Sequence, residues 1–303
     1  MPNMKDIQDI LNLKKERNAV ILAHLYMPPE VQDIADFTGD SLELSRNARD
    51  TKADVIVLCG VRFMAETAKI LNPYKTVLLP EPYAGCPMAD MVTLEDVELL
   101  RKKHPGTAVV CYVNSSAEIK AASDICCTSS NAVKVVESLK EEEIIFVPDR
   151  NLGHYVSGFL PSKRFILFDG YCPTHNKISL SDIEKVRAAR PDVPILVHPE
   201  CVSEVIDRAD FTGSTAQIID YAVKSHEKEF IIGTESGILH RLQQLCPAKR
   251  FYTLHAAMIC PNMKKTTLTS VHDALYKLQY KIDLNEQVMK KAAASVDRML
   301  SVY

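Results

Sequence analysis

The sequence predicts an α/β protein of three similar α/β/α domains, with short parallel sheets around a pseudo-threefold axis and the active site at the centre. The string ADFTG occurs at 35–39 and again at 209–213, each time 11 residues after a histidine that ends an apolar run. A third, diverged copy lies between these two. Every copy alternates short Val- and Ile-rich runs with amphipathic stretches, which is typical of buried parallel strands and covering helices.

The three copies align without gaps when they start at His24, Tyr112 and His198. They read HLYMPPEVQDIADFTGDS, YVNSSAEIKAASDICCTSS and HPECVSEVIDRADFTGST. A glutamate, an aspartate and a hydroxyl recur at matched positions. These sets are Glu30, Glu118 and Glu204; Asp36, Asp124 and Asp210; and Ser41, Ser129 and Thr215.

The rest of each copy follows one plan. A second apolar run, a helical stretch ending near a proline, and a third apolar run lead to a cysteine. We expect three strands in each copy and amphipathic helices between the copies. The predicted domains are 1–88, 89–174 and 175–262, with C-terminal helices packed on the outside over 263–303.

Composition excludes several classes of function. The chain has 303 residues and a formal net charge of −3, so it lacks the basic surface of a nucleic-acid-binding protein. No apolar run reaches the roughly 20 residues of a membrane span. The N-terminal stretch reads as an amphipathic helix and has no signal-peptide features. We therefore expect a cytoplasmic protein that binds neither nucleic acid nor membrane.

The repeat places reactive side chains at the ends of the predicted strands. In parallel α/β sheets, ligands bind beyond the carboxyl ends of the strands. If these ends face a common axis, the loops at 24–26, 112–114 and 198–200 meet at one centre with those that follow the second predicted strands, at 60–62, 148–150 and 233–235. The third strands of the copies lead to the same place, and each is followed by one cysteine: Cys86, Cys172 and Cys260.

These three cysteines stand apart from the other six. Nine cysteines, an odd number, in a reducing compartment argue against a disulfide framework, and no C-x-x-C pair indicates a zinc ribbon. Three thiolates binding a [4Fe–4S] cluster would leave one iron open to act as a Lewis acid. The alternative is three buried core thiols that the repeat places alike. Cys201 has no aligned cysteine in the other copies and is interpreted as structural.

The polar loop residues each allow two interpretations. The repeated hydroxyls could cap helices, but three around one axis better fit a ligand with several carboxylates or phosphates. Glu200 could be a general base or the partner of a cation, and Tyr26 could transfer a proton or merely pack. His24 or His198, taken alone, would more often be a hydrogen-bonded strand-end histidine than a catalyst.

Ten collinear motifs resemble those of a known family. They are HLYMPPEVQDIADFTGDS, CPMADM, YVNSSAE, TSSNAV, PDRNLG, YCPTH, HPEC, GSTAQ, GTESG and CPNMKK, and they run from about residue 18 to about residue 270. Together they closely resemble the signatures of the quinolinate synthases, iron–sulfur enzymes of de novo NAD biosynthesis. Two positions depart from the family pattern, which usually has asparagine where this chain has Leu25 and Asp90.

The resemblance implies a condensing transferase. It would join iminoaspartate (iminosuccinate) to dihydroxyacetone phosphate, giving quinolinate, phosphate and two waters. The implied cofactor is a [4Fe–4S] cluster on Cys86, Cys172 and Cys260, whose open iron is the Lewis acid. An aspartate oxidase or aspartate dehydrogenase would be the functional partner.

Motif matching also implies roles for the loop residues. His175 could line the site or orient the loop of Cys172. The implied catalytic residues are Tyr26, His198 and Glu200. The implied substrate-binding residues are His24, Ser41, Tyr112, Val113, Asn114, Ser129, His198, Pro199, Glu200 and Thr215.

Two other functions stay open at this point. One is a different [4Fe–4S] enzyme, a hydro-lyase acting on a small carboxylate, which would share the open iron and the anion-binding hydroxyls. The other is a non-catalytic binding module or scaffold with structural thiols, which gives no reason for the reactive residues to align.

Overall fold

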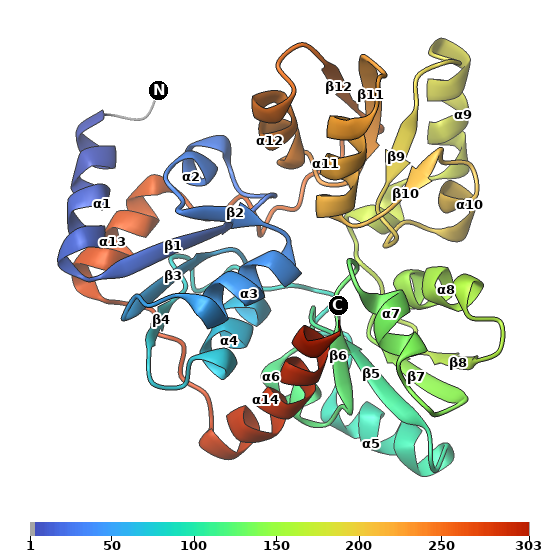
Figure 1. The fold of residues 1–303 in the computed structure, drawn as a ribbon, viewed down its shortest axis with the longest axis horizontal. Coiled ribbons are helices and arrows are strands. Elements are labelled where there is room, and N and C mark those ends of the chain that lie inside the picture. Colours follow the sequence, from blue (N-terminus) through green and yellow to red (C-terminus); the bar gives the residue numbers. More distant parts are fainter. Residues whose placement is uncertain (1–3, 303) are drawn as a thin grey trace.

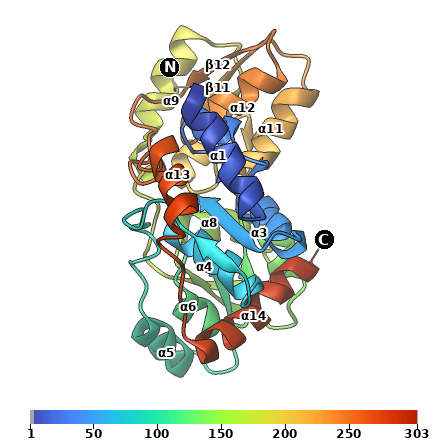
Figure 2. The ribbon, with the colours of Figure 1, turned by 90° about the vertical axis from the view of Figure 1, so that its left-hand side faces the viewer.

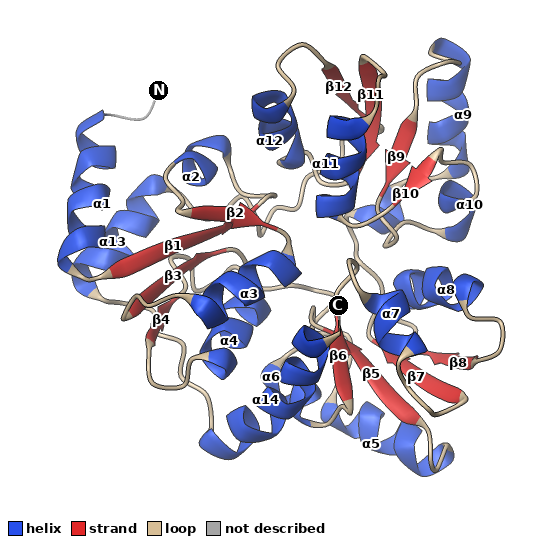
Figure 3. Ribbon diagram, in the orientation of Figure 1, coloured by secondary structure: helices blue, strands red, loops and turns tan. Residues whose placement is uncertain are grey.

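Three lobes surround a common centre in the computed structural model, which describes residues 4–302 (Figure 1). Each lobe holds one four-stranded parallel sheet with helices against it, as the colouring in Figure 3 makes plain. The strand orders are equivalent: β2-β1-β3-β4, β6-β5-β7-β8 and β10-β9-β11-β12. The predicted fold class, three similar α/β/α domains, is confirmed.

The elements follow the repeat. The first lobe contains α1 (Met4–Glu16), β1 (Ala19–His24), α2 (Pro29–Asp33), β2 (Phe37–Gly39), α3 (Ser41–Asp50), β3 (Val55–Cys59), α4 (Arg62–Leu71) and β4 (Thr76–Leu78). The second contains α5 (Leu94–Lys103), β5 (Ala108–Tyr112), α6 (Ala117–Ala121), β6 (Ile125–Cys127), α7 (Ala132–Glu137), β7 (Glu143–Val147), α8 (Arg150–Phe159) and β8 (Arg164–Leu167). The third contains the 3₁₀ turn η1 (His175–Lys177), α9 (Leu180–Ala189), β9 (Ile195–Val197), α10 (Ser203–Ile206), β10 (Phe211–Thr212), α11 (Thr215–Lys224), β11 (Glu229–Gly233), α12 (Ile238–Leu245) and β12 (Arg250–Thr253).

The sheets contain one strand more than the sequence predicts. The additional strands are β2, β6 and β10, which lie at the edge of each sheet and are two or three residues long. The ADFTG string itself forms two of them, although its pattern indicates only a turn. A strand this short shows no readable periodicity, and its existence depends on pairing with the strand that precedes it along the chain.

The repeated aspartate is structural. Its carboxylate accepts a hydrogen bond from the main-chain amide of the first strand of the same lobe and pairs with a cation from the helix before that strand. The amide distances are 2.8 Å for Asp36 to Ile21, 2.8 Å for Asp124 to Val109 and 2.7 Å for Asp210 to Ile195. The cations are Lys14, Arg101 and Arg187.

We expect Asp124→Ala to lower the free energy of unfolding by about 1–2 kcal/mol, because the Val109 amide loses its carboxylate acceptor. Urea denaturation followed by circular dichroism measures this change. Asp192→Ala, in an exposed loop, is the control and should stay within about 0.5 kcal/mol of wild type. Equal effects of the two substitutions would contradict the structural role of the repeated aspartate.

The helices α13 (Leu268–Lys277) and α14 (Glu286–Ser301) pack on the outside of the first two lobes. Helix α13 lies beside α1, as both views show, and α14 lies on α6 and β6 (Figure 2). The first two lobes and these helices share one hydrophobic core, whereas the third lobe has core clusters of its own. The boundaries expected at 88, 174 and 262 stay a prediction.

Candidate active site

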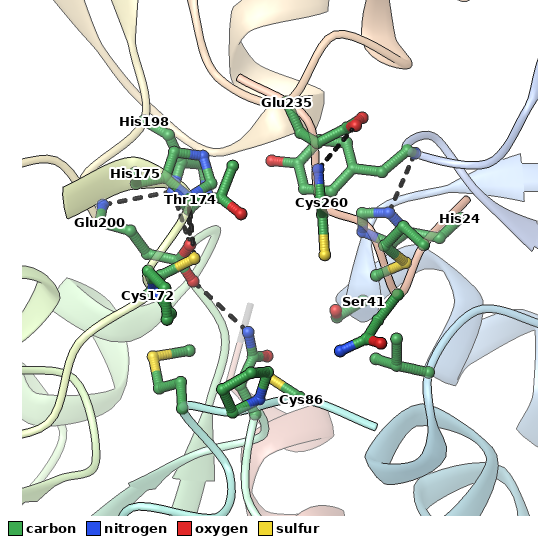
Figure 4. Close-up of a pocket in the computed structure, with 18 of the residues that line it drawn as sticks. His24, Ser41, Cys86, Cys172, Thr174, His175, His198, Glu200, Glu235 and Cys260 are labelled. Atoms are coloured by element: carbon green, nitrogen blue, oxygen red, sulfur yellow. Dashed lines mark hydrogen bonds and ion pairs between the residues drawn. The ribbon is translucent and has the colours of Figure 1, made fainter. Parts of the chain in front are cut away.

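One pocket at the centre of the molecule is lined by all three lobes (Figure 4). In each sheet the first strand (β1, β5 or β9) lies between the second and the third. The connections that leave the first and second strands therefore run to opposite sides of the first strand. This divergence opens a crevice at the carboxyl ends of the strands. The predicted site residues that line the pocket are His24, Tyr26, Ser41, Cys86, Tyr112, Asn114, Ser129, Cys172, His198, Glu200, Thr215 and Cys260.

Two predicted residues are not part of the pocket lining. Val113 and Pro199 are buried beside it, and substrate contact by either stays a prediction. Leu25 is also buried away from the lining, so the departure from asparagine changes no pocket wall. Asp90 is exposed and lies outside the lining as well.

The three aligned cysteines come to the pocket from three sides, as Figure 4 shows. Cys86, Cys172 and Cys260 are partly exposed, whereas the other six cysteines are buried. Burial raises the pKa of all three thiols, that of Cys86 to about 12. Negative neighbours add to this effect, since Glu200 and Cys260 raise the pKa of Cys86, and Glu200 and Cys86 raise that of Cys172.

This set of thiols fits an iron–sulfur cluster. Thiolates are the usual ligands of such clusters, and a bound metal would relieve the charge repulsion that opposes their ionisation. Cys172 belongs to a second possible metal-binding group with His175 and Glu200, whose ligand atoms lie within 4.8 Å of one another. The atoms of that group already bond to each other, with His175 Nδ1 2.7 Å from Glu200 Oε2 and 3.2 Å from Cys172 Sγ.

Glu200 is the buried acid of the pocket. Its Oε1 accepts hydrogen bonds from the Tyr112 hydroxyl at 2.7 Å and from Asn114 Nδ2 at 3.4 Å. Burial would raise the pKa of Glu200, but His175, His198 and the Tyr112 hydroxyl bring it down to about 2. The side chain is therefore held as a carboxylate inside the protein.

The two strand-end histidines are held in the same orientation. Nδ1 of His24 accepts the main-chain amide of Tyr26 at 3.1 Å, and Nδ1 of His198 accepts that of Glu200 at 3.2 Å. Burial lowers the pKa of each imidazole to about 3, so both are neutral near pH 7. Each must then carry its proton on Nε2, which makes both histidines hydrogen-bond donors.

A chain of short contacts joins the two predicted proton-transfer groups. The Tyr26 hydroxyl lies 2.6 Å from Thr234 Oγ1, which lies 2.8 Å from His175 Nε2. His175 in turn contacts Glu200 through its other nitrogen. The sequence gives His175 no firm role and places the loop at 233–235 near the centre without assigning a role to Thr234. In the structure Thr234 directly follows β11, the third strand of its lobe.

The repeated hydroxyl residues Ser41 and Thr215 do not cap the helices that they begin. Asp40 caps α3 and Ser214 caps α11, so Ser41 and Thr215 are the first residues of these helices and line the pocket. Ser130 of the second lobe joins the two cap residues, because its Oγ lies 2.5 Å from Asp40 Oδ2 and 2.7 Å from Ser214 Oγ. The N-termini of α3 and α11 thus converge on the pocket and favour an anionic ligand there.

Three α/β units whose strand ends share one pocket lined by thiols, histidines and a carboxylate define an enzyme with a central active site. The family model described as quinolinate synthetase A protein matches residues 8–301. The chain is 55% identical over 294 residues to a quinolinate synthase of Caldicellulosiruptor bescii, with 97% of each chain covered. It is 52% identical over 296 residues to one of Alkaliphilus metalliredigens, with 98% of each covered.

The chain belongs to the quinolinate synthase family. It is an enzyme of this class, and the family is iron–sulfur dependent and acts in NAD biosynthesis. In residues 4–302, no helix has the length and apolar character that crossing a membrane requires.

Proposed function

We propose that this enzyme condenses iminoaspartate with dihydroxyacetone phosphate, and that Cys86, Cys172 and Cys260 hold a [4Fe–4S] cluster. The observation that carries the proposal is the meeting of three partly exposed thiols with a buried carboxylate and two neutral histidines in one pocket. A bound cluster would supply a Lewis acid at the iron that has no cysteine ligand. Another cluster-dependent hydro-lyase would need the same thiols but a different substrate.

The pocket offers donors for two anionic substrates. Iminoaspartate carries two carboxylates, and dihydroxyacetone phosphate carries a phosphate. The Nε2 protons of His24 and His198, and the hydroxyls of Ser41, Ser129 and Thr215, would bind these groups. Asn114 Oδ1, which is buried and has no hydrogen-bond partner among the described residues, would accept a hydrogen bond from an N–H or O–H group of a substrate.

Glu200 would accept a proton in the reaction, and Tyr26 would donate one. Forming the new ring requires loss of protons from carbon and nitrogen, loss of phosphate and departure of two waters. Glu200, which is ionised, would accept a proton from carbon. Burial and the charge of Glu200 raise the pKa of Tyr26 well above its usual value, so the phenol would keep its proton for a leaving oxygen. His175 would orient Glu200 through its 2.7 Å contact.

The substrate assignment predicts phosphate release that requires both substrates. Anaerobic enzyme supplied with dihydroxyacetone phosphate and freshly generated iminoaspartate should release one phosphate per quinolinate formed. Omission of iminoaspartate should abolish phosphate release. Dehydration of a small hydroxy acid without quinolinate formation would favour the hydro-lyase instead.

Iminoaspartate hydrolyses readily, so an enzyme that oxidises aspartate would have to supply it. An aspartate oxidase or aspartate dehydrogenase fits that requirement. Free thiols at all nine cysteines suit a reducing compartment, and the cytoplasm stays our prediction.

A further inference from the structure

We propose that Glu235 is a positioning residue that joins the loop of Cys260 to the loop of Tyr26 through Lys264. The inference rests on the proposed function, because it takes Cys260 as a cluster ligand and Tyr26 as a proton donor. Glu235 and Lys264 lie outside the catalytic, substrate-binding and metal-binding sets predicted from the sequence. Figure 4 shows Glu235 beside Cys260 at the pocket wall.

Every contact of the Glu235 carboxylate comes from a hydrogen-bond donor. Its side chain is fully buried, and Oε1 accepts the main-chain amide of Cys260 at 3.2 Å. Oε2 accepts the amide of Gly237 at 2.7 Å. Lys264 Nζ lies 3.0 Å from Oε1 and 3.1 Å from Oε2. The carboxylate therefore fixes the main chain of a cluster cysteine directly.

Lys264 carries the connection to the first lobe. Its Nζ also donates to the main-chain oxygen of Tyr26 at 2.5 Å. The chain at Gly237 packs so closely on this loop that an added Cβ would lie 2.7 Å from the Tyr26 main chain. Gln32 holds the same loop by donating to the carbonyl oxygens of Leu25, Met27 and Gly237. The ion pair thus couples the loop of Cys260 to the loop of Tyr26 in the first lobe.

The repeat shows that the fold does not require this carboxylate. The residues aligned with Glu235 are Val61 in the first lobe and Asp149 in the second. Asp149 is also buried, and the main-chain amide of Cys172 is among the groups that lower its pKa against the effect of burial. Its Oδ2, however, has no hydrogen-bond partner in the described part of the chain. Asp149 Oδ1 caps α8 by accepting the Leu152 amide at 2.8 Å. Because the first lobe forms with valine at this position, the fold alone does not account for the Glu235 carboxylate.

The test compares Glu235→Gln with Glu229→Gln in anaerobically purified protein. Glu229 begins the strand that Glu235 follows, and it pairs with Arg190 and Arg250 far from the pocket lining. Glutamine keeps the shape of the Glu235 side chain, but its NH₂ group replaces a carboxylate oxygen that accepts hydrogen bonds from the Cys260 amide, the Gly237 amide or Lys264. We expect Glu235→Gln to bind iron with an altered visible or paramagnetic-resonance spectrum, and kcat to fall about 10- to 100-fold with KM little changed. Glu229→Gln should match wild type.

Lys264→Met separates the two halves of the connection. It leaves the bond from Cys260 to Glu235 in place but removes the link to Tyr26, so kcat should fall while the spectrum stays close to wild type. If Glu235→Gln fails to fold, a lower kcat with a near-wild-type spectrum in Lys264→Met still supports the inference. Wild-type spectrum and kcat in either variant would overturn it. An iron-free wild-type protein would overturn the proposed function as well, a result visible before any variant is compared.

Discussion

Cys172→Ser is expected to abolish cluster binding and to lower turnover by at least about 100-fold. The alcohol of serine ionises far less readily than a thiol and is a poorer ligand for iron–sulfur clusters. Cys172 lines the pocket, and its Sγ lies 3.2 Å from His175 Nδ1, which already contacts Glu200. Iron and sulfide analysis with the absorption spectrum of anaerobic protein measures the loss.

Cys201→Ser is the matched control for this substitution. Cys201 adjoins Glu200 in the sequence but is fully buried, and its thiol faces the main-chain oxygen of Gly233 at 3.6 Å. We expect this variant to keep its iron. Loss of iron from Cys201→Ser, or its survival in Cys172→Ser, would contradict the ligand assignment.

Glu200→Gln is expected to keep the cluster and to lower turnover by about 100-fold or more, the usual scale for a proton-transfer group. Glutamine can still accept the Tyr112 hydroxyl, but it cannot take a proton from substrate. Quinolinate formation by the loaded enzyme, normalised to iron content, measures the effect. This normalisation separates a chemical defect from loss of cofactor.

Glu204→Gln supplies the comparison for Glu200→Gln. Glu204 belongs to the same segment and to the aligned glutamate set, but it is exposed at the start of α10. Its replacement should leave turnover near the wild-type rate. Near-normal turnover in Glu200→Gln would remove Glu200 from the proton transfers.

The sequence predicts those parts of the fold and site that depend on local pattern or on the repeat. The strand ends at His24 and Tyr112, and the one at Val197 just before His198, follow from apolar runs. The three cysteines follow from equivalent positions in three copies. The edge strands escape prediction because they are too short to have a period of their own. The aspartates just before these edge strands are visible in the sequence as a repeat. Their hydrogen bonds to the main-chain amides of the first strands appear only in the folded sheet.

The parts of the site that break the repeat were harder to predict. Thr234 and Lys264 matter through contacts with Tyr26, which is more than 200 positions away along the chain. No short-range pattern records such a contact. The repeat places the loop at 233–235 near the centre but assigns no role to Glu235, whose aligned residues are Val61 and Asp149.

The most direct test of the account is the iron and sulfide content of the protein purified without oxygen, read together with its visible spectrum. We expect about four irons and four sulfides per chain and a brown colour that fades in air. A colourless protein that stays free of iron after reconstitution would contradict the central claim. The three pocket thiols would then have no cofactor to hold.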